Sequence, residues 1–179
     1  SSANIDFTTT PGSIVPIANA VTNVYVTDMN NDRVQKFENS GNFILKWGTG
    51  GSGDGQFGHP QGIAIDSSNN IYVVDLDRDR VQKFDSNGNF IRKWGTNGNG
   101  DGQFDKPKDV AVDSLNNVYV TDQDNNRVQK FDSNGIFIRK WGINGSGDGQ
   151  LKKPVGIGVD NSDNIYVADR DNDRVQKFD

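Results

Sequence analysis

Short apolar runs alternate with polar turns along the chain, and residues 60–106 display the pattern most clearly. Residues 62–66 form a short, mainly apolar run that ends in Asp66, and residues 71–74 form a second run rich in β-branched and aromatic side chains, which predicts strands. Residues 80–84 alternate polar and apolar side chains, as a half-buried strand does, and residues 89–94 supply a fourth strand. The linking segments are short and polar, so an antiparallel meander is expected. Asn87-Gly88, between the last two strands, predicts a type I′ turn.

The same pattern recurs every 47 residues. The string Arg-Val-Gln-Lys-Phe begins at four positions with this spacing, and Trp residues repeat with it: Arg33, Arg80, Arg127 and Arg174, and Trp47, Trp94 and Trp141. A repeat of this length that encodes four strands matches a β-propeller blade better than a helical pair. The sequence therefore predicts an all-β protein, a β-propeller of four-stranded antiparallel blades with about four blades per chain.

The strand count also predicts how the array ends. We expect one propeller domain over residues 1–179, with blades at 13–59, 60–106, 107–153 and 154–179. The first blade has a degenerate first strand near residues 14–18, and the fourth stops after its third strand. In residues 4–10, Ile5 and Phe7 alternate with polar residues. This segment is expected to be the closing outer strand of the last blade, which would cover its open edge.

The repeated strings resemble NHL repeats. In the second unit the matching residues are 60–66, 70–75, 79–84 and 88–91, and equivalents follow near Pro107 and Pro154. The resemblance covers nearly the whole chain after about Val21 and implies a β-propeller. Members commonly have six blades, whereas this chain has about four. Members bind proteins or, through a basic face, RNA, and some related propellers are metal-dependent lyases or lactonases, so the fold alone does not choose a function.

Charge and composition narrow the partners. The net charge is −5, and an acidic surface repels phosphate backbones, so no nucleic acid partner is expected. Lysines recur on the third and fourth strands, where we expect solvated side chains. The chain has no Cys and no apolar stretch long enough for a transmembrane helix, so no membrane insertion is expected. The start at Ser1 fits a cleaved secretory signal or a trimmed chain. With the glycosylation sequon at Asn144, it favours an extracellular or cell-surface location.

The turn between the second and third strands is rich in carboxylates. Oxygen ligands at alternate positions suit calcium, and the candidate metal ligands are Asp75, Asp77, Asp79, Asp122, Asp124, Asp169, Asp171 and Asp173. The alternative is that Asp and Asn cap the turn through its own backbone. Each loop alone offers too few ligands for calcium, so we expect no cofactor and keep calcium as the alternative.

The other repeated residues are predicted to be structural. Arg33, Arg80, Arg127 and Arg174 are expected to form ion pairs, either with Asp66, Asp113 or Asp160 or with an Asp of the turn. Trp47, Trp94 and Trp141 are expected to pack against the neighbouring blade. His59 is the only histidine, and most acidic residues recur in every unit, whereas catalysis needs a unique constellation. No enzyme is therefore expected.

The sequence favours a non-enzymatic protein-interaction or self-assembly scaffold. Chains would join through the N-terminal strand and the blade edges, giving a homo-oligomer or a filament, or would bind another protein. A calcium- or glycan-binding propeller is the alternative, and a metal-dependent lyase- or lactonase-like enzyme is a third hypothesis.

Overall fold

The computed structural model describes residues 23–179, which form four antiparallel sheets. The strands of sheet 1 are β1 (Asn23–Asp28), β2 (Arg33–Glu38) and β3 (Phe43–Trp47). Those of sheet 2 are β4 (Pro60–Ile65), β5 (Ile71–Asp75), β6 (Arg80–Phe84) and β7 (Phe90–Trp94). Those of sheet 3 are β8 (Pro107–Val112), β9 (Val118–Asp122), β10 (Arg127–Phe131) and β11 (Phe137–Trp141). Those of sheet 4 are β12 (Pro154–Val159), β13 (Ile165–Asp169) and β14 (Arg174–Phe178). The strand predictions at residues 4–10 and 14–18, with Ile5 and Phe7, lie outside the described residues.

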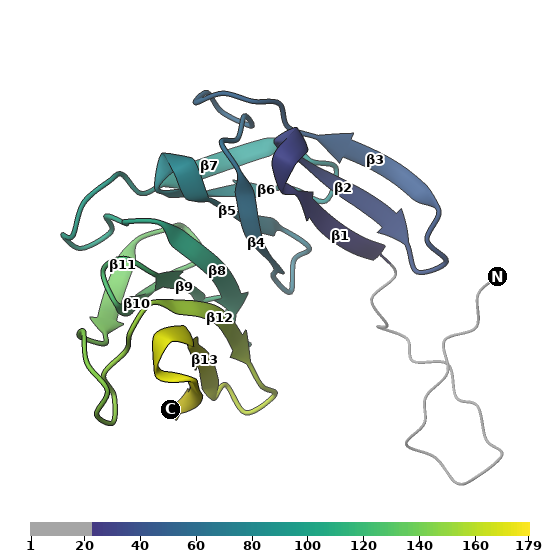
Figure 1. Ribbon diagram of the computed structural model, residues 1–179. Coiled ribbons are helices and arrows are strands. Elements are labelled where there is room, and N and C mark those ends of the chain that lie inside the picture. The colour runs from purple at the N-terminus through teal and green to yellow at the C-terminus, as the bar shows by residue number, and fades with distance from the viewer. Residues whose placement is uncertain (1–22) are drawn as a thin grey trace, which may run out of the picture.

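The sheets follow one another in an arc (Figure 1), in the order of the chain. The strands β4, β8 and β12 lie on the inner side of the arc, and β3, β7 and β11 lie on its outer rim. Sheets 1 and 4 form the two ends of the arc. The all-β prediction is confirmed, and the described sheets form an open array of blades. No helix among residues 23–179 is both long and apolar enough to span a membrane.

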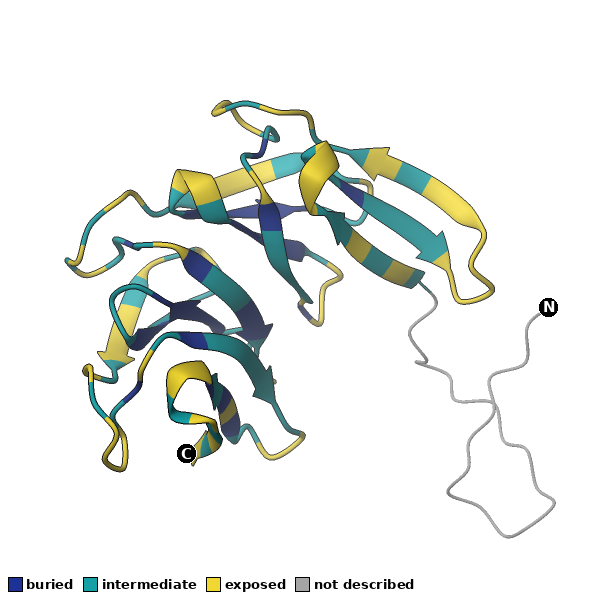
Figure 2. Ribbon diagram, in the orientation of Figure 1, coloured by how far each residue is buried: buried dark blue, intermediate teal, exposed yellow. Residues whose placement is uncertain are grey.

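Three apolar clusters, one between each pair of neighbouring sheets, hold the arc together. In β5, Ile71 and Val73 pack toward sheet 1, whereas Tyr72 and Val74 pack toward sheet 3. The whole of β5 and β6 is buried, and Figure 2 shows the dark middle strands of the arc between lighter ends. The prediction that residues 80–84 form a half-buried strand is therefore wrong, because both faces of an interior sheet are covered.

The turn between the second and third strands of a sheet is a single turn of 3-10 helix in three of the four sheets. These turns are η1 (Met29–Asn31), η2 (Leu76–Arg78) and η3 (Arg170–Asn172). The residue after each turn is left-handed: φ is 51° at Asp32, 48° at Asp79 and 50° at Asp173. Asn126, which ends the corresponding turn of sheet 3, has φ 53°. Asp and Asn tolerate this conformation better than other non-glycine residues.

The hairpin between β6 and β7 corrects the type I′ prediction. Only Gly88 has positive φ (80°), and the ladder shifts register between Lys83 and Phe84. The Gly88 amide donates to the Asp85 carbonyl at 3.0 Å, as in a type I turn followed by a glycine bulge. The Asp85 carboxylate accepts hydrogen bonds from the amides of Asn87 and Asn89 (2.8 and 2.9 Å), which stabilises that turn instead.

Candidate functional site

A buried arginine–aspartate pair lies at the start of the third strand in sheets 2 and 3. The Arg80 Nε donates to Asp75 Oδ2 at 2.9 Å, and both side chains are almost completely buried. The antiparallel register places the two residues directly opposite each other. Arg127 and Asp122 repeat this pair at 2.7 Å, and partly exposed versions join Arg33 to Asp28 and Arg174 to Asp169. Of the two partners considered for these arginines, the structure selects the aspartate at the turn.

The rest of the Arg80 guanidinium binds the connector that precedes sheet 2. It donates to the carbonyls of Ser52, Gly53 and Gln56 at 2.8, 3.2 and 2.7 Å. The other Asp75 oxygen accepts the backbone amide of Gly58 at 2.7 Å. Burial raises the pKa of Asp75 above its ordinary value, although these hydrogen bonds oppose the shift. The pair therefore anchors the glycine-rich connector, and both carboxylate oxygens of Asp75 accept hydrogen bonds within the protein.

The carboxylates predicted as calcium ligands divide into three groups. Asp75, Asp122 and Asp169 are the buried partners of the arginines. Asp79 Oδ1 accepts the backbone amide of Lys106, in the connector to the next sheet, at 2.9 Å, and Asp173 ends the equivalent turn of sheet 4. Asp77, Asp124 and Asp171 lie at the surface beside cationic or histidine side chains: His59, Lys153 and Arg170, respectively. Within residues 23–179, no three acidic or histidine side chains gather in a metal-ligating group.

The tryptophans pack against the following sheet. The ring centroids of Trp47 and Phe84 lie 5.7 Å apart, and those of Trp94 and Phe131 lie 5.8 Å apart. Trp141 repeats the contact with Phe178 at 5.8 Å. Tyr25, in the same sheet as Trp47, meets its ring edge-on at 6.2 Å. These aromatic contacts continue from sheet to sheet across the arc.

Two lysines of the third strand, Lys83 and Lys36, link neighbouring sheets, contrary to the expectation that they are solvated. Lys83 is buried, its Nζ lies 4.9 Å from the ring centroid of Tyr72, and it donates to the Ser133 carbonyl of sheet 3 at 3.0 Å. Lys36 donates to the Ser86 carbonyl of sheet 2 at 2.9 Å. The missed signal is the repeated Tyr that lies opposite each Lys across the ladder.

Asp109 is a polar residue that does not recur in the repeat. It stands in β8 where β4 and β12 carry Gly62 and Gly156. Its carboxylate accepts the backbone amide of Ile157, in β12, at 3.0 Å, and burial raises its pKa. A Cβ on Gly62 would lie 2.5 Å from the Asp109 Cα, so the inner strands approach closely here. Asp109 therefore links sheets 3 and 4 on the inner side of the arc.

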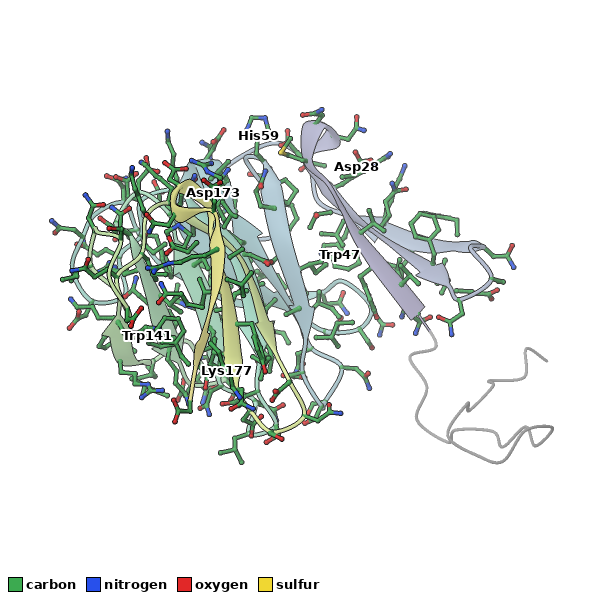
Figure 3. All side chains as sticks on the ribbon, turned by 60° about the horizontal axis from the view of Figure 1, so that its bottom comes forward. Asp28, Trp47, His59, Trp141, Asp173 and Lys177 are labelled. Carbon is green, nitrogen blue, oxygen red and sulfur yellow. The ribbon has the colours of Figure 1, made fainter. Side chains whose placement is uncertain are left out.

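The two ends of the arc expose residues whose equivalents are buried. Val175 of β14 is 66% exposed, whereas Val34, Val81 and Val128 are fully buried. At the other end, Val24 and Val26 of β1 are 45% and 42% exposed. Figure 3 shows Asp173 and Lys177 at opposite ends of β14. Asp28 and His59 lie on the same side of the molecule as Asp173 (Figure 3). We call the exposed face of β13 and β14 the sheet 4 end face, and that of β1 and β2 the sheet 1 end face.

Asp160, in the turn between β12 and β13, provides a test of the turn geometry. The side chain and backbone of Asn164 donate to its carboxylate and lower its pKa to about 2. Since this pKa lies below the unfolded value, the bonds stabilise the fold at neutral pH. That contribution is lost as the pH falls through about 2. A carboxyl-carbon NMR titration should give a midpoint near 2, and Asn164→Ala should raise it toward 3.8. A midpoint near 4 in the unsubstituted chain would contradict this geometry.

Comparison with known proteins identifies the repeat. A family model described as NHL repeat matches residues 104–131 and 151–178, and one described as 6-bladed beta-propeller matches residues 10–85. No curated protein matches the sequence.

Similar solved structures share the fold at low identity. A streptogramin B lyase is 17% identical with a TM-score of 0.66, and the match covers 95% of this chain and 56% of the lyase chain. Virginiamycin B lyase from Staphylococcus aureus is 15% identical with a TM-score of 0.63, covering 93% and 58%. A protein of unknown function from Bacteroides thetaiotaomicron is 18% identical with a TM-score of 0.70, covering 87% and 44%. This chain thus spans about half the length of these structures, and the likeness is one of fold.

Proposed function

The chain belongs to the NHL-repeat β-propellers, and on this premise we propose that it is a non-enzymatic protein-interaction and self-assembly module. The end faces of the arc are its binding surfaces, and their natural occupant is another propeller blade. We further propose a location at the cell surface or outside the cell, on the sequence features given above.

One observation carries the proposal: the same side chain is buried inside the arc and exposed at its end. The strand valines Val34, Val81 and Val128 are covered by the following sheet, whereas Val175 is not. Covering an exposed valine removes apolar surface from water at about 25 cal/mol per Å². Covering the sheet 4 end face with a further blade would therefore be favourable, as it is at the junctions inside the arc.

The charged groups support a non-enzymatic module. The repeated acids of the turns are bound by arginines or backbone amides, and His59 pairs with Asp77 at the surface. Each of these bonds maintains a turn or a connector. The two lyases share the fold with this chain at 15–17% identity, and fold likeness of that kind does not transfer a reaction.

The outer edge of sheet 4 supports completion by a further strand. In each other sheet a phenylalanine of the outer strand meets one of the third strand, as Phe90 meets Phe84 at 6.1 Å. Beside Phe178 there is instead a hollow of about 290 Å³, which Trp141 and Arg139 also line. We propose that residues 4–10, which lie outside the described residues, supply this outer strand.

Light scattering over a range of concentrations tests the proposal. We expect the mass to exceed the 19.6 kDa of one chain and to rise toward a multiple of it with concentration. Phe7→Asp should reduce this association if residues 4–10 complete sheet 4. A mass of 19.6 kDa at every concentration, with no partner bound, would overturn the assembly function.

A further inference from the structure

We infer that Asn144 is a deamidation site, at which the backbone nitrogen of Gly145 attacks the asparagine side chain, and that weak hydrogen bonding selects this position. The site lies in the connector between sheets 3 and 4, and the inference is independent of the proposed function. It rests on the hydrogen bonds of the Asn-Gly pairs that the repeat places in its turns and connectors.

The reaction needs no partner other than water. The Gly145 nitrogen forms a bond with Cγ of Asn144, and its proton leaves with the side-chain nitrogen as ammonia. Water then opens the resulting cyclic imide at either of its two carbonyls. One product is aspartate, and the other is isoaspartate, in which the main chain continues through the side-chain carbons. A glycine in the second position favours the attack, because it has no Cβ to hinder the approach of its nitrogen.

The chain contains several pairs with this chemistry, so the residue types alone do not select one of them. The Asn-Gly pairs are Asn87-Gly88, Asn97-Gly98, Asn99-Gly100, Asn134-Gly135 and Asn144-Gly145. Every asparagine in these pairs is exposed, so access to water does not distinguish them either. The hydrogen bonds of each pair therefore determine which one reacts first.

Short hydrogen bonds restrain the glycine amides of the other four pairs. Gly88, Gly98 and Gly135 donate to backbone carbonyls at 3.0, 2.9 and 2.9 Å. Gly100 donates to the side-chain oxygen of Gln103 at 2.9 Å. A nitrogen must lose its proton to attack, so an amide that donates a hydrogen bond has to give up that bond first. These four bonds therefore slow the reaction in the folded protein.

The Gly145 amide is held by a longer bond. It donates to the Leu151 carbonyl at 3.3 Å, outside the range of about 2.7–3.2 Å that N–H···O bonds prefer. In the preceding connector, Gly98 makes the equivalent bond to the Phe104 carbonyl at 2.9 Å. Gly145 therefore gives up the weakest bond of the five when its nitrogen attacks.

The side chain of Asn144 also lacks the bond that restrains its equivalent. Asn97, at the same position of the preceding unit, donates its side-chain amide to Asp79 Oδ2 at 3.0 Å. The residue equivalent to Asp79 is Asn126, whose own side-chain amide donates to the Asp124 carbonyl at 3.3 Å. Within residues 23–179, no side-chain hydrogen bond restrains Asn144. Its Cγ is therefore free to rotate toward the following nitrogen.

Deamidation is expected to weaken the junction between sheets 3 and 4. Leu151 is fully buried in the apolar cluster of this junction. Its amide donates to the Ile143 carbonyl at 2.9 Å and its carbonyl accepts the Gly145 amide, so the two bonds flank Asn144. Isoaspartate lengthens the main chain at residue 144, and the two bonds can no longer form in the same register. The modified chain should therefore unfold at a lower temperature than the freshly purified chain.

Peptide mapping after incubation in mildly alkaline buffer tests the inference. The protein is purified from a host without N-glycosylation, and trypsin then releases residues 141–152, in which Asn144 is the only asparagine. Residues 94–108, which contain Asn97 and Asn99, form the internal comparison. Asn144 is expected to react about tenfold faster than Asn97, the ratio that corresponds to one hydrogen bond. In urea, where these bonds are absent, the Asn-Gly pairs should react at comparable rates.

Two variants complete the test. Asn126→Asp supplies the carboxylate that Asp79 provides for Asn97, so it should slow the reaction at Asn144 about tenfold. Asn144→Gln removes the reactive pair and should keep its melting temperature during the incubation. The inference is overturned if another Asn-Gly pair reacts first in the folded protein, or if Asn144 stays unmodified. It is also overturned if Asn126→Asp leaves the rate at Asn144 unchanged, because hydrogen bonding would then not select the site.

Discussion

Arg80→Ala is expected to lower the free energy of unfolding by about 3–5 kcal/mol, the range found when one partner of a buried ion pair is removed. The substitution leaves the fully buried Asp75 carboxylate without its cation. It also removes the donors to three connector carbonyls, which lie in the segment between sheets 1 and 2. Denaturant unfolding followed by tryptophan fluorescence measures the loss, and a fall in Tm of about 10 °C should accompany it.

Arg33→Ala is the matched control for Arg80→Ala, because it stands at the same position of the repeat. Arg33 bonds Asp28 at 2.7 Å, but both side chains are partly exposed. Water can solvate the remaining carboxylate, so the loss of stability is expected to be much smaller than for Arg80→Ala, as for an exposed pair. Equal losses for the two variants would mean that burial of the pair does not determine its contribution.

Gly88→Ala should destabilise the protein much more than the same change at Gly41. Both glycines occupy the same hairpin position and have similar positive φ values, 80° and 86°. A Cβ on Gly88 would lie 2.7 Å from Trp47 Cδ2, whereas nothing lies within 4 Å of a Cβ on Gly41. Left-handed backbone costs an alanine about 1–2 kcal/mol, and the overlap with tryptophan adds about 1–3 kcal/mol.

Gly135 gives an independent repeat of this comparison. Its Cβ would lie 2.5 Å from Trp94 Cδ2, so Gly135→Ala should match Gly88→Ala. Chemical denaturation of the three variants gives the difference directly. If all three lose the same stability, backbone strain alone is responsible, and the close contact between hairpin and tryptophan is unimportant in solution.

The repeat and its alternation were enough to predict the class of fold. Trp47 and its equivalents mark the end of each outer strand, and the strand pattern before them fixes an antiparallel sheet. The prediction that residues 80–84 are half-buried was wrong. Alternating polar and apolar side chains indicate a strand with one covered face, whereas an interior sheet of a stacked array has both faces covered. The sequence of a single unit does not show whether a neighbour lies on its polar side. Burial of Lys83 was missed for the same reason.

Turn types and ion-pair partners were harder to predict, because several side chains near each turn can bond the same groups. The type I′ turn at Asn87-Gly88 was the natural reading of the dipeptide, but the Asp85 carboxylate binds the amides of the turn. The arginine partner stayed open because Asp66 and Asp75 both lie near the third strand in sequence. Asp66 is instead bound by Asn70 and Tyr72. Asp109 was detectable in principle, because it is an acid at a position where the units before and after it carry Gly62 and Gly156.

The bond from the Lys106 amide to Asp79 links one unit of the sequence to the next, and His59 with Asp32 and Lys153 with Asn126 repeat it 47 residues apart. Each acceptor and its donor are therefore separated by the same number of residues in every repeat, whichever residue is taken as the first of the unit. Recombination that inserts or removes 47 residues, wherever in the unit it begins, would again place a backbone amide donor opposite an equivalent side-chain acceptor. A gene of this kind can lengthen or shorten its product by whole blades without first evolving a new boundary.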